Sequence, residues 1–445
     1  MGTAAHSETS MRAVLALAWP IMVSMLSYTL MSVADTLFVS RLGTDPLAAV
    51  GLAAVVVFFT QSFGAGLMSG VRILVAQATG SQQDNVAARL GWQGLWVALP
   101  LGLAMASLSL LPPSLFELLG ATHTVAEFAD NFFSVRVLGA PLVLTNLGMS
   151  AWFQGRGDTR TPMKAALIGN AFNIAVDPLL IFGLYGLPAL GVTGAASATV
   201  LAMAIQVVYL AIKIRPHIGH VPMHADRDLL APLWTTGAPV GVRYALSMGS
   251  FVVFSSMITF VGPIELAAHI IVVRVCSVSF LPGHAIGEAA GVLVGQFIGA
   301  GRRELALPVS WSATKLAVAI MVSWGVVFWF APAFLVAPFD AEPAVASVAI
   351  KILMVAAAFQ LFDAIVMALS GSLNGAGDTK WVMVVSLLCA WLIKVPFAYL
   401  FAFGAALGAQ GAWLGFTVEL VILSGLVVWR IRGKQWLKHS ILPPA

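Results

Sequence analysis

Charged residues are scarce in this sequence. Only 9% of the 445 residues are Asp, Glu, Lys or Arg, whereas 60% are hydrophobic, and an average soluble domain carries roughly 25% charged residues. Mean hydropathy over the chain is +0.94. So few charges cannot cover a water-exposed surface of this size. The composition therefore excludes an ordinary soluble protein and predicts that most of the chain lies in lipid.

Cysteine, metal-binding patterns and nucleotide-binding motifs are also missing or nearly so. The two cysteines, Cys276 and Cys389, lie in apolar segments, which excludes a disulfide framework and predicts free thiols. The eight histidines show no metal-ligand spacing, and no glycine-rich phosphate loop ends in Lys-Ser or Lys-Thr. We therefore expect no cofactor, no use of ATP and no enzymatic activity, and the polar start Met1–Ser10 lacks the features of a cleaved signal peptide.

Long apolar segments recur along the whole chain. Each is long enough to cross a bilayer, which takes about 20 residues of helix, and lipid offers no partner to the unpaired backbone of an open strand. The alternating ten-residue pattern of an outer-membrane barrel is absent. The sequence thus predicts an all-α membrane protein with twelve spans, at 13–38, 46–70, 90–112, 131–152, 162–186, 189–212, 232–260, 266–290, 308–331, 346–371, 381–404 and 408–430.

The basic residues predict the orientation of these spans. With the N-terminus inside, fifteen of the 23 Lys and Arg residues fall in cytoplasmic segments, and only Arg41, Arg136 and Lys351 fall in outer loops. Because basic loops stay on the cytoplasmic side, we expect an inner-membrane protein with both termini cytoplasmic. The basic run from Arg430 to Lys438 is then interpreted as an anchor beside anionic lipid, and no nucleic acid is needed to explain it.

The two halves of the chain repeat each other. Pro20 aligns with Pro239 and Gln77 with Gln296, both at an offset of 219, and the turn 155–160 returns as 375–380. Six spans per copy predict two six-helix bundles that enter the membrane in the same sense and are related by a pseudo-twofold axis. The predicted organisation is an N-lobe at 1–215, a cytoplasmic linker at 216–231 and a C-lobe at 232–445, with substrate handled by alternating access between the lobes.

Five carboxylates interrupt the apolar spans. A carboxylate at mid-bilayer costs about 2.5–3.5 kcal/mol even on the permissive insertion scale, so it normally faces a cavity or a partner. Burial also favours the neutral form of a carboxyl group, which suits proton exchange. These five are therefore the candidate functional residues, namely Asp35, Asp177, Glu288, Asp363 and Glu419.

Two of these acids have helix-breaking prolines nearby. Asp35 follows Pro20 in the first span, where the missing N–H and the ring should let the helix bend. Asp177 precedes Pro178, and Asn173 lies four residues earlier on the same helix face. Hydration of Asp35 near the outer end of its helix, and simple satisfaction of Asp177 within the packing, are the alternatives. We favour a functional polar cluster around a bendable first helix.

The remaining acids are more ambiguous. Asp363 lies in the tenth span and either serves transport or forms a structural pair with Lys394 or Arg243. Glu288 and Glu419 fit packing or a salt bridge equally well. A repeated Gly-x-Gly-Asp turn is also found in intramembrane aspartyl proteases, but here both copies lie in short turns between spans, which favours a structural role.

In combination, several short motifs resemble those of the multidrug and toxic compound extrusion (MATE) family. Taken singly they are weak, but they occur in order and in duplicate over nearly the whole chain. They comprise Pro20 and the segments 35–43, 75–80, 155–159, 173–178, 190–196 and 295–301. The resemblance implies a transporter that exports organic cations or amphipathic drugs in exchange for H⁺, or alternatively Na⁺, and that we expect to be monomeric.

The resemblance also implies where the coupling ion acts. The DinF-like branch, which this sequence resembles more closely, places its essential acids in the first and fifth helices, matching Asp35 and Asp177 with Asn173 and Thr199. The NorM-like branch uses an acid in the seventh helix with one in the tenth. Asp363 matches the latter, but the seventh helix here has no acid around 247–254. N-lobe coupling is therefore expected.

The sequence is also compatible with a different transport function. A flippase for lipid-linked oligosaccharides or other lipids, from the same broader superfamily, would need a basic central cavity to hold pyrophosphate. The sequence embeds five basic residues in its spans that could contribute, although they do not cluster along the chain: Arg72, Arg243, Arg274, Lys315 and Lys394.

Overall fold

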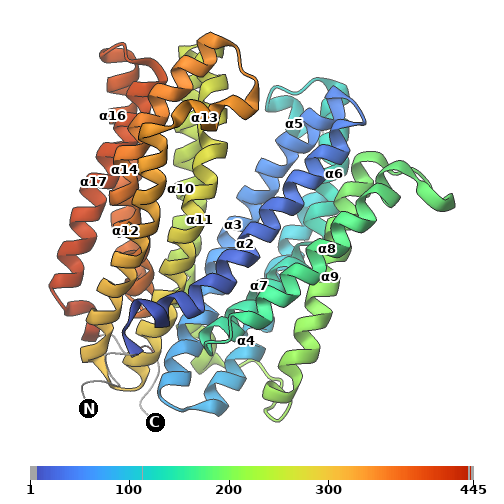
Figure 1. Ribbon diagram of the computed structural model, residues 1–445. Coiled ribbons are helices and arrows are strands. Elements are labelled where there is room, and N and C mark those ends of the chain that lie inside the picture. Colours follow the sequence, from blue (N-terminus) through green and yellow to red (C-terminus); the bar gives the residue numbers. More distant parts are fainter. Residues whose placement is uncertain (1–7, 113, 439–440, 442–445) are drawn as a thin grey trace. The chain divides into compact units, whose positions relative to one another are not determined.

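The computed structural model describes residues 8–112, 114–438 and 441. Within these residues every regular element is a helix, which confirms the all-α prediction (Figure 1). The first half contains α2 (Met11–Ser40), α3 (Thr44–Gly80), α4 (Asp84–Ala106), α5 (Ser114–Leu118), α6 (His123–Leu138), α7 (Ala140–Gly155), α8 (Arg160–Phe182) and α9 (Gly191–Ile218). The second half contains α10 (Arg227–Val261), α11 (Pro263–Gly299), α12 (Ala306–Phe330), α13 (Pro332–Val336), α14 (Pro343–Gly375), α15 (Thr379–Cys389), α16 (Val395–Tyr399) and α17 (Gly408–Arg432).

The described residues contain eleven single helices long and apolar enough to span a membrane, and a twelfth span when α6 and α7 are taken together. The prediction of twelve spans is thereby confirmed. The π-helical turn Ala390–Lys394 joins α15 to α16, and a second π-helical turn, Leu400–Gly404, continues α16 to the end of the same span. Each π turn contains one residue more than an α turn, and such turns often occur at functional positions.

The fourth span differs from its prediction. The sequence placed it at 131–152, whereas the structure builds it from α6 and α7, which together cover 123–155 and are bent by 46° at their junction. Gly139 lies at this junction, and a Cβ there would approach Val200 Cγ2 to 2.6 Å. Pro141 follows at the start of α7. Two features explain the bend. Gly139 lets the neighbouring helix approach closely, and Pro141 has no N–H with which to continue the helical hydrogen bonds.

The internal repeat is visible in the packing. Helices α3 and α11 start and end 219 positions apart, at 44 and 263 and at 80 and 299. A Cβ on Gly155 would meet the backbone carbonyl of Arg72, and a Cβ on the equivalent Gly375 would meet that of Gly291, 219 positions after Arg72. The same helix pair therefore approaches at the same glycine in both halves.

By contacts, the chain divides into two compact units. One is Pro20–Gly241, and the other joins the residues up to Trp19 with Val242 and everything after it. The boundaries fall inside α2 and α10, close to the aligned residues Pro20 and Pro239. The lobe limits inferred from the repeat, 1–215 and 232–445, stay a prediction.

The segment expected to act as a linker, 216–231, is half helical, because α9 continues to Ile218 and α10 begins at Arg227. The turn between them is attached to α4 within the first unit. Gln93 donates to the carbonyl of His224 at 3.0 Å and accepts from the N–H of Asp226 at 2.9 Å, and Arg89 forms an ion pair with Asp226. This turn is thus fixed to the first unit and is not a free tether.

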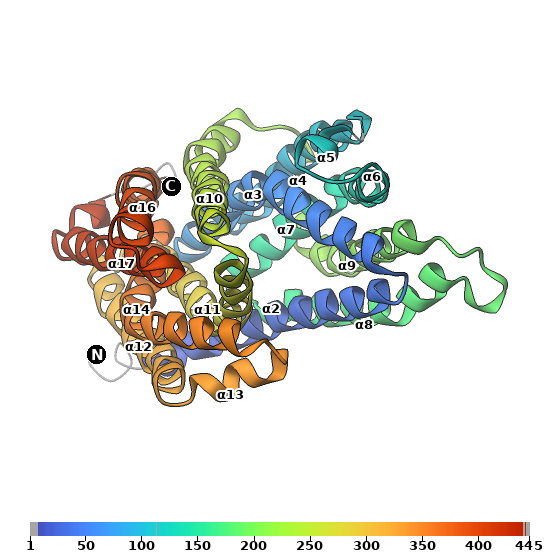
Figure 2. The same ribbon diagram turned by 90° about the horizontal axis from the view of Figure 1, so that it is seen from above.

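Each unit packs around its own central helices (Figure 2). In the first unit α3 packs against α4, α6 and α7, while α8 and α9 form a pair. In the second, α14 packs against α11, α12 and α17. The α11–α14 contact is the closest: a Cβ on Gly371 would lie 2.0 Å from the carbonyl oxygen of Gly287, and one on Gly375 2.0 Å from that of Gly291. Small residues at i and i+4 on facing helices allow this approach in membranes.

Candidate functional site

Helices α2, α8 and α9 bring together four of the residues expected from the sequence. Asp35 lies near the end of α2, Asn173 and Asp177 lie one turn apart on α8, and Thr199 lies on α9. Asn173 and Asp177 are fully buried and Thr199 is 2% exposed, whereas Asp35 is partly buried. The prediction of a polar cluster in the first half of the chain thus corresponds to a real juxtaposition.

The two carboxyl groups of this cluster are neighbours. Asp35 and Asp177 lie close enough to interact, and the Asn173 side chain lies beside both. Two carboxylates that lie so close together repel each other strongly in a low-dielectric environment, and a proton shared between them removes this repulsion. The pair is therefore suited to hold one proton between two oxygen atoms.

Asn173 links the pair. With its amide oriented to satisfy both polar atoms, Nδ2 donates to Asp35 Oδ1 at 2.9 Å and the amide oxygen accepts from the Thr199 N–H at 3.3 Å. In the opposite orientation Nδ2 faces Asp177 Oδ1 at 3.4 Å. An amide carries both donors and an acceptor, so it can serve a carboxylate in one state and a carboxylic acid in another.

Thr199 contributes in a way the sequence did not suggest. Its hydroxyl donates to the carbonyl of Ala195 at 3.0 Å, on its own helix, and only its backbone N–H reaches Asn173. Pro178 lies directly after Asp177 inside α8. Because proline has no N–H, one carbonyl of the preceding turn loses its helical partner. Local backbone polarity at the acid pair is therefore higher than in a regular helix.

Arg136 is a functional candidate that the sequence analysis missed. It was assigned to an outer loop, but it lies in the last turn of α6, inside the fourth span. Its charge acts on Asp35, and its Nε is buried with no hydrogen-bond partner among the described residues. The signal that could have revealed it is a basic residue five positions before a proline in an otherwise apolar segment.

A second polar cluster lies next to the first and was also missed. Gln206 accepts from the Tyr28 hydroxyl at 2.6 Å and from Asn146 at 3.0 Å, and it donates to Asn170 at 3.3 Å. Asn170 in turn donates to Ser27 at 2.8 Å. This network connects α2, α7, α8 and α9.

The second cluster continues from the acid pair at helical spacing. Tyr28 precedes Asp35 by seven residues, Asn170 precedes Asn173 by three, and Gln206 follows Thr199 by seven. Residues three or seven positions apart share a helix face. Polar side chains thus extend along the inner faces of α2, α8 and α9.

Asp363 belongs to the other compact unit. It is 6% exposed on α14, and the structure gives it no salt bridge among the described residues. The alternative considered from the sequence, a structural pair with Lys394 or Arg243, is not found among the described residues; Lys394 lies 3.7 Å from Glu419 and donates to Ser250 at 2.8 Å. Asp363 is therefore a buried acid without an ion pair among the described residues, and the charge of Glu419 acts on it.

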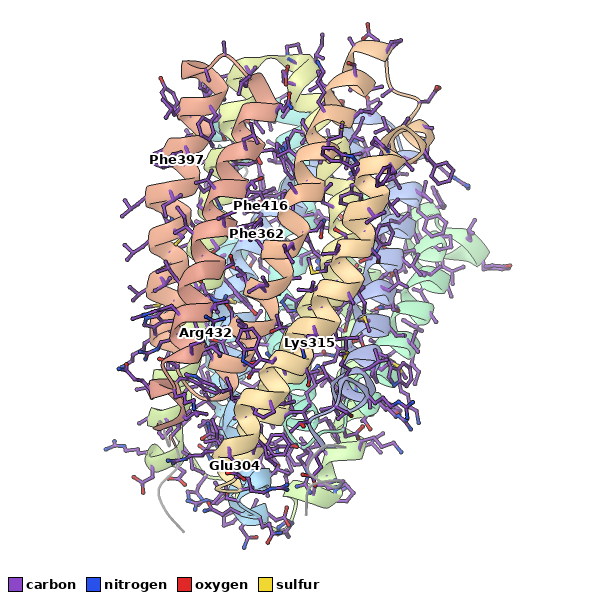
Figure 3. The ribbon with its side chains drawn as sticks, turned by 60° about the vertical axis from the view of Figure 1, so that its left-hand side comes forward. Glu304, Lys315, Phe362, Phe397, Phe416 and Arg432 are labelled. Atoms are coloured by element: carbon purple, nitrogen blue, oxygen red, sulfur yellow. The ribbon has the colours of Figure 1, made fainter. Side chains whose placement is uncertain are left out.

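Aromatic side chains surround this second acidic site. The Lys394 ammonium lies 5.5 Å from the ring centre of Phe416. Phe362 lies midway along α14, and Phe416 lies in the first half of α17 (Figure 3). His269 is held between the Ser255 hydroxyl at 3.1 Å and the Trp413 indole at 3.2 Å. The site is therefore packed with side chains and contains its own cation.

The other candidates have structural surroundings. Glu288 lies 3.9 Å from His284 on the same helix. In the repeated turns, Asp158 accepts from the N–H of Thr161 at 3.0 Å, and Asp378 pairs with Arg430 at 2.7 Å. In the part of the chain that the structure describes, no three His, Cys, Asp or Glu side chains gather as a metal site would require.

Comparison with known proteins places this geometry in a family. The MatE family model matches twice, over residues 20–179 and 239–400, which reproduces the internal repeat. The "Probable multidrug resistance protein NorM" of Pseudomonas putida is 32% identical over 98% of this chain and 96% of its own length. That of Burkholderia pseudomallei is 33% identical over 94% of this chain and 92% of its own length.

Solved structures agree in fold. A MOP superfamily transporter from Pyrococcus furiosus superposes with a TM-score of 0.88 at 24% identity, covering 97% of both chains. A MATE structure in the straight conformation gives a TM-score of 0.87 at 25% identity, covering 96% of this chain and 97% of the other. Two matches of the family model, full-length relatives above 30% identity and the shared fold lead to one conclusion: this multi-pass membrane protein belongs to the MATE family of transporters.

Proposed function

We propose that this protein exports organic cations and amphipathic drugs in exchange for protons, and that the Asp35–Asp177 pair holds the exchanged proton. The observation that carries this proposal is that these two carboxyl groups lie together, beside Asn173, within membrane-spanning helices. The relatives named multidrug resistance proteins support the substrate class. We expect the protein to work as a monomer.

The chemistry of the carboxyl pair supports the choice of H⁺ over Na⁺. Binding Na⁺ requires removing its water and replacing it with several oxygen ligands, and the charge of Arg136 near Asp35 opposes any added cation there. A proton forms a covalent O–H bond with the carboxyl and leaves the pair hydrogen-bonded. The cluster thus favours a proton as the coupling ion.

In the mechanism we propose, the ionised pair binds the exported cation or orders the path along which it moves. Protonation of the pair from outside lowers the affinity of the protein for this cation. Pro20, which lies at the boundary of the compact units inside α2, provides the position at which the first helix bends. Loss of charge on Asp35 changes the partner of the Asn173 amide, and the Tyr28–Gln206 network transmits this change along α2. Proton and substrate therefore compete.

Efflux from membrane vesicles tests the proposal. Wild type should expel a cationic dye under an imposed pH gradient and should not do so under a sodium gradient alone. Asp35→Asn should abolish efflux, whereas Glu127→Gln, an exposed carboxyl on α6, should retain it. Normal pH-driven efflux by a correctly inserted Asp35→Asn protein would refute the role of the pair. No efflux under either gradient would favour a lipid flippase.

A further inference from the structure

The outer face of α8 and α9 carries an apolar groove of about 400 Å³. Its exposed residues include Ile168, Leu201, Val208 and Ile212, with exposed fractions of 45%, 46%, 58% and 66%. Its lining consists of Ile168, Phe172, Leu201, Ala204, Ile205, Val208, Tyr209 and Ile212. Apolar side chains that are exposed on membrane-spanning helices lie against lipid chains.

The groove arises from the local packing of the two helices, which lie side by side up to the turn after Phe182 (Figures 1 and 2). A Cβ on Gly169 would lie 2.3 Å from Gln206 Cγ, so the helix axes approach closely here. Ala204, one of the small residues on α9, leaves the hollow between the larger side chains. A close helix pair with a small residue on its outer side forms a slot of the width of one hydrocarbon chain.

Two lysines lie at one end of this slot. Lys164 precedes Ile168 by four residues, and Lys213 follows Tyr209 by four, so both continue the faces that line the groove. The helices are antiparallel, and the contact between positions 169 and 206 places Lys164 opposite position 211, two residues from Lys213. The two ammonium groups are therefore at the same level.

These ammonium groups are available for an anion. Both side chains are exposed, and the structure gives neither an ion pair among the described residues. Lys213 is oriented by Tyr209, whose ring centre lies 5.9 Å from its nitrogen. The neighbouring acid Asp158 is occupied at the start of α8, where it accepts from the N–H and the hydroxyl of Thr161.

We propose that this groove binds an anionic phospholipid. The acyl chain lies in the slot between Ile168 and Ile212, and the phosphate lies between Lys164 and Lys213. Basic residues beside a membrane span attract anionic headgroups electrostatically, and a zwitterionic headgroup adds a positive charge that two lysines repel. The inference does not depend on the transported substrate, since the groove lies on the outer face of α8 and α9.

Native mass spectrometry of the full-length protein in mixed micelles tests this proposal. Phosphatidylglycerol and phosphatidylcholine with identical acyl chains are supplied at equal concentration. Wild type should retain one phosphatidylglycerol at about tenfold or greater excess over phosphatidylcholine. The double variant Lys164→Gln/Lys213→Gln should lose this preference, and Lys380→Gln, an exposed lysine at the start of α15, should keep it.

A second variant separates the acyl site from the charge. Ala204→Trp fills the slot and keeps both lysines, so it should reduce retention of the phospholipid while inorganic phosphate has no effect on either protein. Equal retention of both lipids by wild type, or unchanged preference in the double lysine variant, would overturn the proposal. Displacement of the lipid by inorganic phosphate alone would show that only an anion is bound, and would overturn the acyl-chain part.

Discussion

At the scale of single residues, we expect Arg136 to oppose the binding of Na⁺ at the acid pair. Its charge acts on Asp35 inside a span. Replacing it with Gln removes a charge–charge repulsion of about 1–3 kcal/mol. Arg136→Gln should therefore increase Na⁺ affinity about 10–100-fold.

This change is measured as sodium-gradient-driven dye efflux, absent in wild type and present in the variant. Arg136→Lys keeps the charge and is the matched control, so it should behave like wild type. If Arg136→Gln shows no response to sodium while retaining pH-driven efflux, the arginine does not determine the choice of ion.

Lys394 is the cation that the structure places beside the buried Glu419 of the second unit. It and Glu419 are each 5% exposed, and their charged atoms are 3.7 Å apart. Removing one partner of a buried pair leaves an uncompensated charge, which costs about 3–5 kcal/mol, whereas replacing both by neutral residues is often tolerated.

Lys394→Met should therefore lower the apparent melting temperature in detergent sharply, and Lys394→Met/Glu419→Gln should recover most of the loss. Scanning fluorimetry on the two variants and wild type is sufficient. A single variant as stable as wild type would mean that Glu419 is neutral in the folded protein and that the ion pair is not structural.

The residue-level predictions from sequence succeeded where chemistry was conspicuous against its surroundings. Asp35, Asn173 and Asp177 stand out because acids and amides are rare in apolar spans, and the structure brings them together. Arg136 was missed because it lies near one end of the predicted span 131–152 and was counted with the outer loop. Gln206 was missed because a single amide in a long apolar helix shows no partner until the helices are placed in space.

At the scale of helices, hydropathy predicted the number of spans but not their lengths or bends. Helix α11 covers 263–299 where 266–290 was expected, because its last turns, at 291–299, stay helical and bury apolar side chains such as Val294 and Phe297. The bend between α6 and α7 depends on a contact of Gly139 with Val200, which is 61 residues distant in sequence. Local sequence patterns do not show contacts between residues so far apart in the chain, so this bend could not be predicted from them.

The α11–α14 contact makes a prediction at this scale. A Cβ on Gly371 would lie 2.0 Å from the carbonyl oxygen of Gly287, so Gly371→Ala forces two backbones apart. Overpacking of this kind typically costs about 1–3 kcal/mol. The variant should melt at a lower temperature than Gly425→Ala, whose Cβ meets no atom within 4 Å. Equal melting of the two would show that α11 and α14 can separate at little cost.

At the scale of the whole molecule, the distribution of charge determines how the chain lies in the membrane. Successive spans must alternate in direction, so the turns after α3, α7, α9, α11 and α14 lie on the side of the N-terminus. That side carries most of the basic residues. Of the three basic residues first assigned to the opposite side, Arg136 and Lys351 lie inside helices, and only Arg41 remains in a turn. The charge asymmetry is thus stronger than the sequence suggested.

Because basic turns remain in the cytoplasm, we expect both termini there and the turn 183–190 between α8 and α9 outside. Green fluorescent protein fused after the C-terminus should fluoresce, since it folds only in the cytoplasm, and alkaline phosphatase inserted after Tyr185, which is 95% exposed, should be active. Alkaline phosphatase inserted after Arg302, in the turn between α11 and α12, is the matched control and should be inactive. The opposite pattern in all three fusions would invert the topology and place the headgroup site at Lys164 and Lys213 in the outer leaflet.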